Sequence, residues 1–203
     1  MVGKSVLLIV ALFVFQKSSP PKAMLFFGDS LTAGYGLSPE EAFPALVEKE
    51  FNKKSTLVKV TNAGLSGETS AGGLTRIDWV LRQPIDVFVL ELGANDGLRG
   101  LPLDQTRKNL QGIIDKVKAK YPQAKLVLAG MMVPPNMGKQ YSSEFKSIYP
   151  DLAKKNNGTL VPFLLEGVGG NEKLNQADGI HPNVEGHRII ARNLSVILSK
   201  LIQ

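Results

Sequence analysis

The chain of 203 residues contains no cysteine and only two histidines, His181 and His187. Without cysteine it can form no disulfide, no thiolate metal site and no thiol nucleophile, and an oxidising compartment is harmless to it. Two histidines without an H-x-x-x-H pattern argue against a metal centre, and no nucleotide-binding motif is present. We therefore expect no metal and no cofactor.

Long hydrophobic runs are also absent. The longest, Val6 to Phe15, has ten apolar residues, whereas a helix needs ~20 to span a bilayer. It follows the basic residue Lys4, as in a secretory signal peptide. The segment QKSSPPKA that follows has no clean A-x-A cleavage site, so an uncleaved anchor stays open. It also has no cysteine to which a lipid could be attached. We expect residues 1–19 to be a signal peptide or N-terminal anchor and the protein to be periplasmic or secreted, with no other stable membrane insertion.

The charge does not favour a nucleic-acid partner. The net charge is +6, which could suit a polyanion. The lysines are scattered over expected helices and loops with acids nearby, and no nucleic-acid motif accompanies them. We interpret the excess as a solvated basic surface and expect no nucleic-acid binding.

Residues 23–203 read as one α/β domain without a linker or an internal repeat. Apolar runs that predict strands alternate five times with segments of helical periodicity. This alternation predicts βαβ units and a parallel sheet covered by helices on both faces. The expected strands are 23–27, 57–60, 87–90, 125–129 and 160–161, and the expected helices are 39–51, 69–81, 103–120, 142–156 and 184–202.

Polar, glycine-rich segments follow all five expected strands. They read GDS, NAGLSGE, GANDGLRG, MMVPPNMG and, after a long loop, DGIHPN. In parallel α/β folds ligands bind beyond the carboxyl ends of the strands. Five such segments at one edge of a sheet favour a functional site over five unrelated turns.

The residue types at this edge suit acyl transfer. Ser30 ends the first strand, and a serine needs a base to become a nucleophile. Asp178 and His181 can hydrogen-bond across one turn, which leaves the other ring nitrogen for Ser30, as in serine hydrolases. The Ser30 and Gly67 N–H groups and the Asn95 amide could bind the developing oxyanion. Taken alone, each of these motifs is more often an ordinary turn, and only their joint occurrence favours a site. His187 is expected on a surface or half-buried helix face.

Together the blocks GDSLTAGYG, NAGLSGETS, ELGANDGLRG and DGIHPN make the chain resemble the SGNH or GDSL hydrolases over residues 23–200. It is most similar to the small bacterial arylesterase, thioesterase and lysophospholipase group. The resemblance implies a three-layer α/β/α sandwich with a five-stranded parallel sheet, a flavodoxin-like arrangement. It implies Ser30 as nucleophile, His181 as base and Asp178 as its orienting partner. It also implies Ser30, Gly67 and Asn95 as oxyanion donors.

The expected reaction is hydrolysis of short- to medium-chain carboxylic esters through an acyl-enzyme, with aryl esters, acyl thioesters and lysophospholipids as substrate classes. We expect residues 93–100 to form a flexible, glycine-bounded loop that carries Leu98 and, with residues after the fourth strand, forms an apolar wall. Methionine there would adapt to several chain lengths. The predicted substrate-pocket residues are Asp29, Leu98, Met132 and Val133.

Two alternatives remain open. A carbohydrate O-acetylesterase on the same fold would need an open polar groove with aromatic platforms, but aromatic residues make up only 7% and the single tryptophan, Trp79, is expected to pack on a helix. A non-catalytic binding domain would be favoured by loss of a catalytic residue, yet Ser30, Asn95 and His181 are all present.

Overall fold

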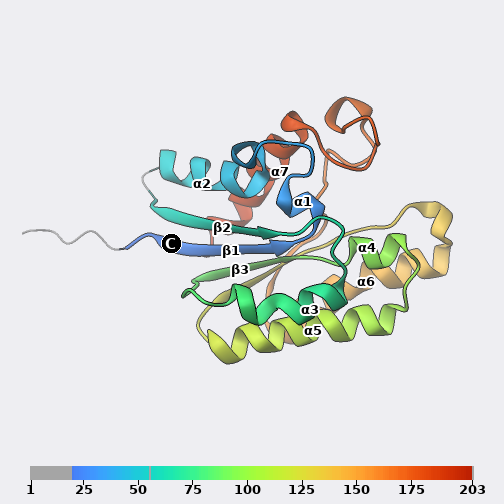
Figure 1. Cartoon of the computed structure of the whole chain (residues 1–203), viewed down its shortest axis with the longest axis horizontal. Coiled ribbons are helices and arrows are strands. Elements are labelled where there is room, and N and C mark those ends of the chain that lie inside the picture. The colour runs from blue at the N-terminus through green and yellow to red at the C-terminus, as the bar shows by residue number, and fades with distance from the viewer. Residues whose placement is uncertain (1–19, 55, 203) are drawn as a thin grey trace, which may run out of the picture.

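The computed structural model describes residues 20–54 and 56–202, so the expected signal peptide or anchor lies outside the described residues. Five parallel strands form one sheet in the order β2-β1-β3-β4-β5 (Figure 1). The predicted alternation and the parallel sheet are confirmed. The strands are β1 (Lys22–Gly28), β2 (Val58–Gly64), β3 (Val87–Glu91), β4 (Lys125–Ala129) and β5 (Thr159–Val161).

Helices cover both faces of the sheet, which confirms the three-layer α/β/α arrangement (Figure 1). On one face α2 (Phe43–Lys53) packs against α7 (Val184–Leu198). On the other, α5 (Leu103–Lys120) contacts both α3 (Ser70–Val80) and α6 (Lys139–Asn156). Among the described residues, none of the helices combines the length and the apolar character needed to cross a membrane. The short elements are α1 (Ser30–Ala33), α4 (Ala94–Leu98), η1 (Pro39–Glu41), η2 (Pro135–Met137) and η3 (Glu172–Leu174).

The interior strand β1 is anchored by aromatic packing on both of its faces. Successive strand residues point to opposite sides of a sheet. Phe26 meets the edge of Phe43 in α2, with ring centroids 5.7 Å apart, and Phe27 packs against Phe88 of β3 at 6.0 Å. All four rings are fully buried, and each contributes roughly 1.5–3 kcal/mol relative to exposure. This packing fixes the strand whose end carries Ser30.

The sheet order places a crevice at the carboxyl end of β1. The chain moves from β1 outward to β2 and then crosses to the other side of β1 to form β3. The segments that follow β1 and β3 therefore leave the sheet side by side, where open α/β sheets bind their ligands. These segments carry Ser30 and Asn95.

The helix expected over residues 39–51 is broken. Pro39–Glu41 forms a 3₁₀ turn, Ala42 is extended (φ −63°, ψ 141°), and α2 begins at Phe43. Pro44 explains the break, because a continuous helix would need its missing N–H and would press its ring against the carbonyl four residues earlier. In the other four expected helices only the ends differ: for example, α6 starts at Lys139 and α7 stops at Leu198.

Two side chains lie where the sequence did not predict them. His187, expected on a surface or half-buried face, is 1% exposed. Its Nδ1 accepts the Phe43 N–H at 3.0 Å, and burial lowers its pKa to about 4. Trp79, expected to pack on a helix, is 71% exposed, and the Arg82 guanidinium lies 3.7 Å from its ring centroid as a cation–π pair.

Candidate active site

The predicted nucleophile lies on a tight turn between β1 and α1, which we call the serine turn (residues 28–32). Asp29 caps α1 because its Oδ1 accepts the Leu31 N–H at 3.0 Å. Ser30 is the first residue of that helix, and Gly34 ends it in the left-handed conformation (φ 77°). A helix of one turn directly after a buried strand leaves the Ser30 side chain at the crevice.

Ser30, His181 and Asp178 form a continuous hydrogen-bonded chain. His181 Nε2 lies 3.0 Å from Ser30 Oγ, and His181 Nδ1 lies 2.6 Å from Asp178 Oδ2. The other Asp178 oxygen accepts the N–H groups of Ile180 and His181 at 2.9 and 3.0 Å. The hydrogen bond from the His181 side chain, followed by these two N–H groups, lowers the pKa of Asp178 to about 2. Asp178 is therefore an ionised acceptor that orients the imidazole.

Two residues outside the predicted set hold the imidazole. The Tyr35 ring lies over the His181 ring, with centroids 4.6 Å apart. Gln176 donates from Nε2 to the Tyr35 carbonyl at 2.7 Å and from its backbone N–H to the His181 carbonyl at 2.7 Å. Tyr35 belongs to the GDSLTAGYG block, five positions after Ser30, and this proximity in the sequence could have indicated a role at the site. Gln176 carried no such clue.

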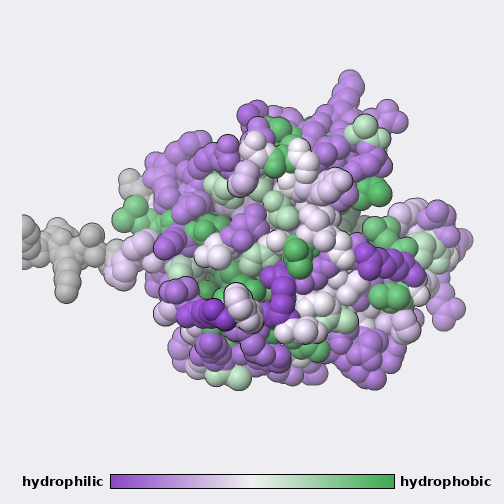
Figure 2. Space-filling view, viewed as in Figure 1, coloured by the Kyte–Doolittle hydropathy of each residue, from purple (hydrophilic) through white to green (hydrophobic). Residues whose placement is uncertain are grey.

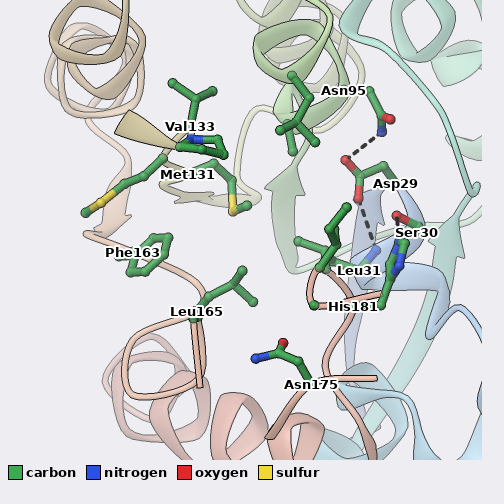
Figure 3. A pocket seen from close by; sticks show the side chains of 18 of the residues that line it. Asp29, Ser30, Leu31, Asn95, Met131, Val133, Phe163, Leu165, Asn175 and His181 are labelled. Atoms are coloured by element: carbon green, nitrogen blue, oxygen red, sulfur yellow. Dashed lines mark hydrogen bonds between the residues drawn. The ribbon is translucent and has the colours of Figure 1, made fainter. Parts of the chain in front are cut away.

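The predicted oxyanion donors come from three segments: Ser30 from the start of α1, Gly67 from the loop after β2 and Asn95 from α4. The Asn95 Nδ2 donates to Asp29 Oδ2 at 3.2 Å (Figure 3). It also donates to the Glu68 carbonyl at 3.0 Å. Gly67, which precedes Glu68, has φ 78°, and its carbonyl accepts from Arg99 at 3.1 Å. The Asn95 amide thus links the Gly67 loop to the serine turn. Both of its N–H groups are engaged, so an oxyanion must share one of them.

The segment after β3 is not the flexible loop expected over residues 93–100. Residues Ala94–Leu98 form the short helix α4, which starts after Gly93 in a left-handed conformation (φ 114°). A Cβ on Gly97 would clash with Val133 and Phe145, so this helix packs directly on its neighbours. Hydrogen bonding within the helix, not loop flexibility, positions Asn95.

An apolar cavity of about 540 Å³ opens beside Ser30 and His181. All four predicted substrate-pocket residues line it, although the carboxyl oxygens of Asp29 are occupied by Leu31 and Asn95. Figure 3 shows Met131, Val133, Phe163 and Leu165 facing Ser30 across the cavity. Hydrophobic side chains also reach the surface at the right-hand edge in Figure 2, beyond the strand ends. The lining residues that the sequence did not predict include Phe163, Leu165 and Ile180.

Comparison with known proteins decides the family. Residues 26–189 match the model of the GDSL-like Lipase/Acylhydrolase family. The chain belongs to this family. It is 37% identical to Esterase TesA of Pseudomonas aeruginosa over 95% of the chain and 96% of the relative. It is 39% identical to Thioesterase 1/protease 1/lysophospholipase L1 of Escherichia coli, covering 96% of the chain and 91% of that relative.

A solved structure agrees with this assignment. The crystal structure of TesA superposes with a TM-score of 0.84 at 39% identity, covering 89% of this chain and 99% of that one. The sandwich described above is thus the SGNH hydrolase fold. The GDSL member described here is a carboxylic ester hydrolase of the SGNH type.

Proposed function

We propose that this SGNH hydrolase cleaves short- to medium-chain carboxylic esters, with aryl esters as good substrates and acyl thioesters and lysophospholipids as further ones. The observation that carries the proposal is the Ser30–His181–Asp178 chain, with steps of 3.0 and 2.6 Å, at the side of an apolar cavity. The cavity suits an acyl chain, and the names of the esterase and thioesterase relatives support the ester and thioester classes.

The proposed reaction has two acyl-transfer steps. His181 Nε2 takes the proton of Ser30 Oγ, which attacks the ester carbonyl carbon, and Asp178 stabilises the imidazolium that forms. The N–H groups of Ser30, Gly67 and Asn95 bind the oxyanion. His181 then protonates the leaving alcohol or thiol, and the acyl group stays on Ser30. Water, deprotonated by His181, releases the acid by the reverse sequence of proton transfers.

Asn95→Ala should lower kcat by roughly 10²–10³-fold with little change in KM, because an oxyanion donor acts in the transition state. Steady-state kinetics with an aryl ester measures this. Because Asn95 also joins Asp29 to Glu68, the thermal midpoint is recorded beside it. A change confined to KM would assign Asn95 to substrate binding instead.

The acyl-chain preference tests the cavity wall. Each buried methylene contributes up to ~0.8 kcal/mol, so kcat/KM for aryl esters should climb a few-fold per carbon until the cavity is full. Val133→Ala and Leu98→Ala remove side-chain atoms from the wall and so enlarge the cavity. Within a series of aryl esters from acetate to laurate, the chain length with the highest kcat/KM should become longer. Leu57→Ala is the matched control, because Leu57 is an exposed leucine at the opposite end of the sheet.

Two outcomes would contradict this assignment. A chain-length profile shared by wild type, Val133→Ala and Leu98→Ala would mean that these residues do not bound the acyl chain. Acetylated sugars that greatly outrun every aryl ester would favour the O-acetylesterase alternative. That alternative has little support here, since the only tryptophan, Trp79, lies on α3 and outside the cavity lining.

We also propose export to the periplasm or the medium. The support is the sequence alone, in which Lys4 precedes the apolar run Val6 to Phe15.

A further inference from the structure

A buried glutamate ties β3 to the serine turn. Glu91 is the last residue of β3, in the middle of the sheet, and it is 0% exposed. Its Oε2 accepts the backbone N–H of Asp29 at 3.2 Å and the hydroxyl of Thr32 at 2.7 Å. Asp29 and Thr32 lie on either side of Ser30 and Leu31. One carboxyl oxygen therefore holds the main chain before the nucleophile and a side chain after it.

The end of β1 is shaped to admit this carboxyl group. Gly28 pairs with Glu91 in the parallel register of β1 and β3. A Cβ built on Gly28 would overlap Thr32 Oγ1 and both the backbone carbonyl and Oε2 of Glu91. Only glycine leaves room for the approach, so the glycine of the GDS motif serves Glu91 as well as the turn.

The surroundings of Glu91 disfavour a negative charge on it. Its other oxygen, Oε1, is buried and has no hydrogen-bond partner among the described residues. The titratable groups that face it are the Asp29 carboxyl from the serine turn and the Tyr149 phenol from α6, and no cation is bonded to it within the described part of the chain. Burial, followed by repulsion from Asp29, raises the pKa of Glu91 well above its ordinary value.

Asp29 is the better site for a charge of the two. Burial raises its pKa to about 6, and the N–H groups of Leu31 and Asn95 oppose that rise. The nearby His181 also lowers the pKa of Asp29, whereas the negative charge of Glu68 raises it. Glu68 is itself paired with the Arg76 guanidinium at 2.5 Å. Two adjacent buried carboxyl groups do not both ionise. Of the two, Asp29 is therefore the carboxyl group favoured to carry the charge, and its Oδ2 accepts the Asn95 amide.

We propose that Glu91 is a positioning residue that acts in its protonated form, holding the serine turn through Oε2 and leaving the single negative charge on Asp29 to orient Asn95. In this state Oε2 still accepts both the Asp29 N–H and the Thr32 hydroxyl, as the amide oxygen of a glutamine would. The inference rests on the proposed hydrolase function, because it concerns how Ser30 and Asn95 are aligned.

Three substitutions in the full chain separate shape from charge. Glu91→Gln is a neutral isostere and should keep kcat within about threefold of wild type at unchanged KM. Glu91→Asp retracts the carboxyl by one methylene, and Glu91→Leu removes it. Both should lower kcat by roughly tenfold or more, again with KM little changed, because the alignment of Ser30 and not substrate binding is lost.

Proton release on unfolding tests the charge state without any assay of activity. At pH 7 the folded protein holds a proton on Glu91, whereas an unfolded glutamate, with a pKa of ~4.3, has lost it. Unfolding of wild type should therefore release about one proton more than unfolding of Glu91→Gln. Calorimetric unfolding in buffers of different ionisation enthalpy measures this number. Glu50→Gln on α2 is the matched control for loss of one carboxyl from a more accessible position.

Either of two results overturns the inference. The first is a folded Glu91→Gln protein whose kcat is as low as that of Glu91→Leu, which would require an ionised Glu91. The second is equal proton release by wild type and Glu91→Gln. Failure of the hydrolase function itself is distinguishable, because the difference in proton release would persist in a chain that hydrolyses no ester.

Discussion

Ser30→Ala should lower kcat for aryl esters by roughly 10³–10⁶-fold, the range seen when a triad member is removed. The Ser30 Oγ lies 3.0 Å from His181 Nε2, and no other hydroxyl is bonded to that nitrogen in the described residues. KM should change little, because the cavity wall is untouched. Ser66→Ala, on the exposed loop next to Gly67, is the matched control and should stay within about twofold.

Covalent labelling checks the same assignment independently. A fluorophosphonate probe should modify Ser30 and no other serine, and mass spectrometry of the digested protein locates the adduct. Ser30→Ala should not react. An adduct on a different serine, or an active preparation that takes no label, would remove Ser30 from the mechanism.

His181→Ala should cost kcat nearly as much as Ser30→Ala, because members of a triad act as a unit. The base must be unprotonated to accept the Ser30 proton, so wild-type kcat/KM should fall on the acidic side. His181→Ala should lose that limb together with the activity. Rates measured between about pH 5 and 9 test this, at pH values where the protein stays folded.

His187→Ala is the control for His181→Ala, because it should affect stability and not activity. It should keep kcat and its pH profile but lower stability, because the buried Phe43 N–H loses its acceptor, which costs about 1–3 kcal/mol. An inactive but folded His187→Ala protein beside an active His181→Ala protein would overturn the proposed triad.

The stability of His187→Ala should also depend less on pH. The folded pKa of His187 is about 4, below the ordinary value of 6.5. The folded state binds fewer protons than the unfolded state, so this contribution is complete above pH 6.5 and is lost as pH falls toward 4. It amounts to about 3 kcal/mol. The difference in thermal midpoint between wild type and His187→Ala, taken at each pH, isolates the His187 contribution. Asp29 and Glu91, whose pKa values are raised, change stability with pH in the opposite direction but are present in both proteins.

Residues whose interactions are local were predictable from the sequence. The contact between Asp178 and His181 spans three positions in one turn, so spacing alone suggests it. The five strands follow from apolar runs, and the parallel sheet follows from their alternation with helices. That alternation places Ser30, Asn95 and His181 at one edge, although Ser30 and His181 are 151 positions apart.

Residues whose roles depend on distant neighbours were not predictable. Glu91 continues the apolar run Val87–Leu90, and nothing local tells whether its carboxyl group is solvated, paired or protonated. Only the register of β1 beside β3 brings it against Asp29 and Thr32. The same holds for Phe163 and Leu165, which reach the cavity because β5 lies beside β4.

The sequence by itself determined the fold class, the edge of the sheet that carries the site, and the chemical groups available there. These depend on hydrophobic periodicity and on short-range turn geometry, which a linear pattern records. The tertiary structure decided that residues 94–98 form a helix, that His187 is a buried acceptor, and how the cavity is walled. Each of these depends on packing or hydrogen bonds between segments far apart in the chain, which exist only once the strands have found their neighbours.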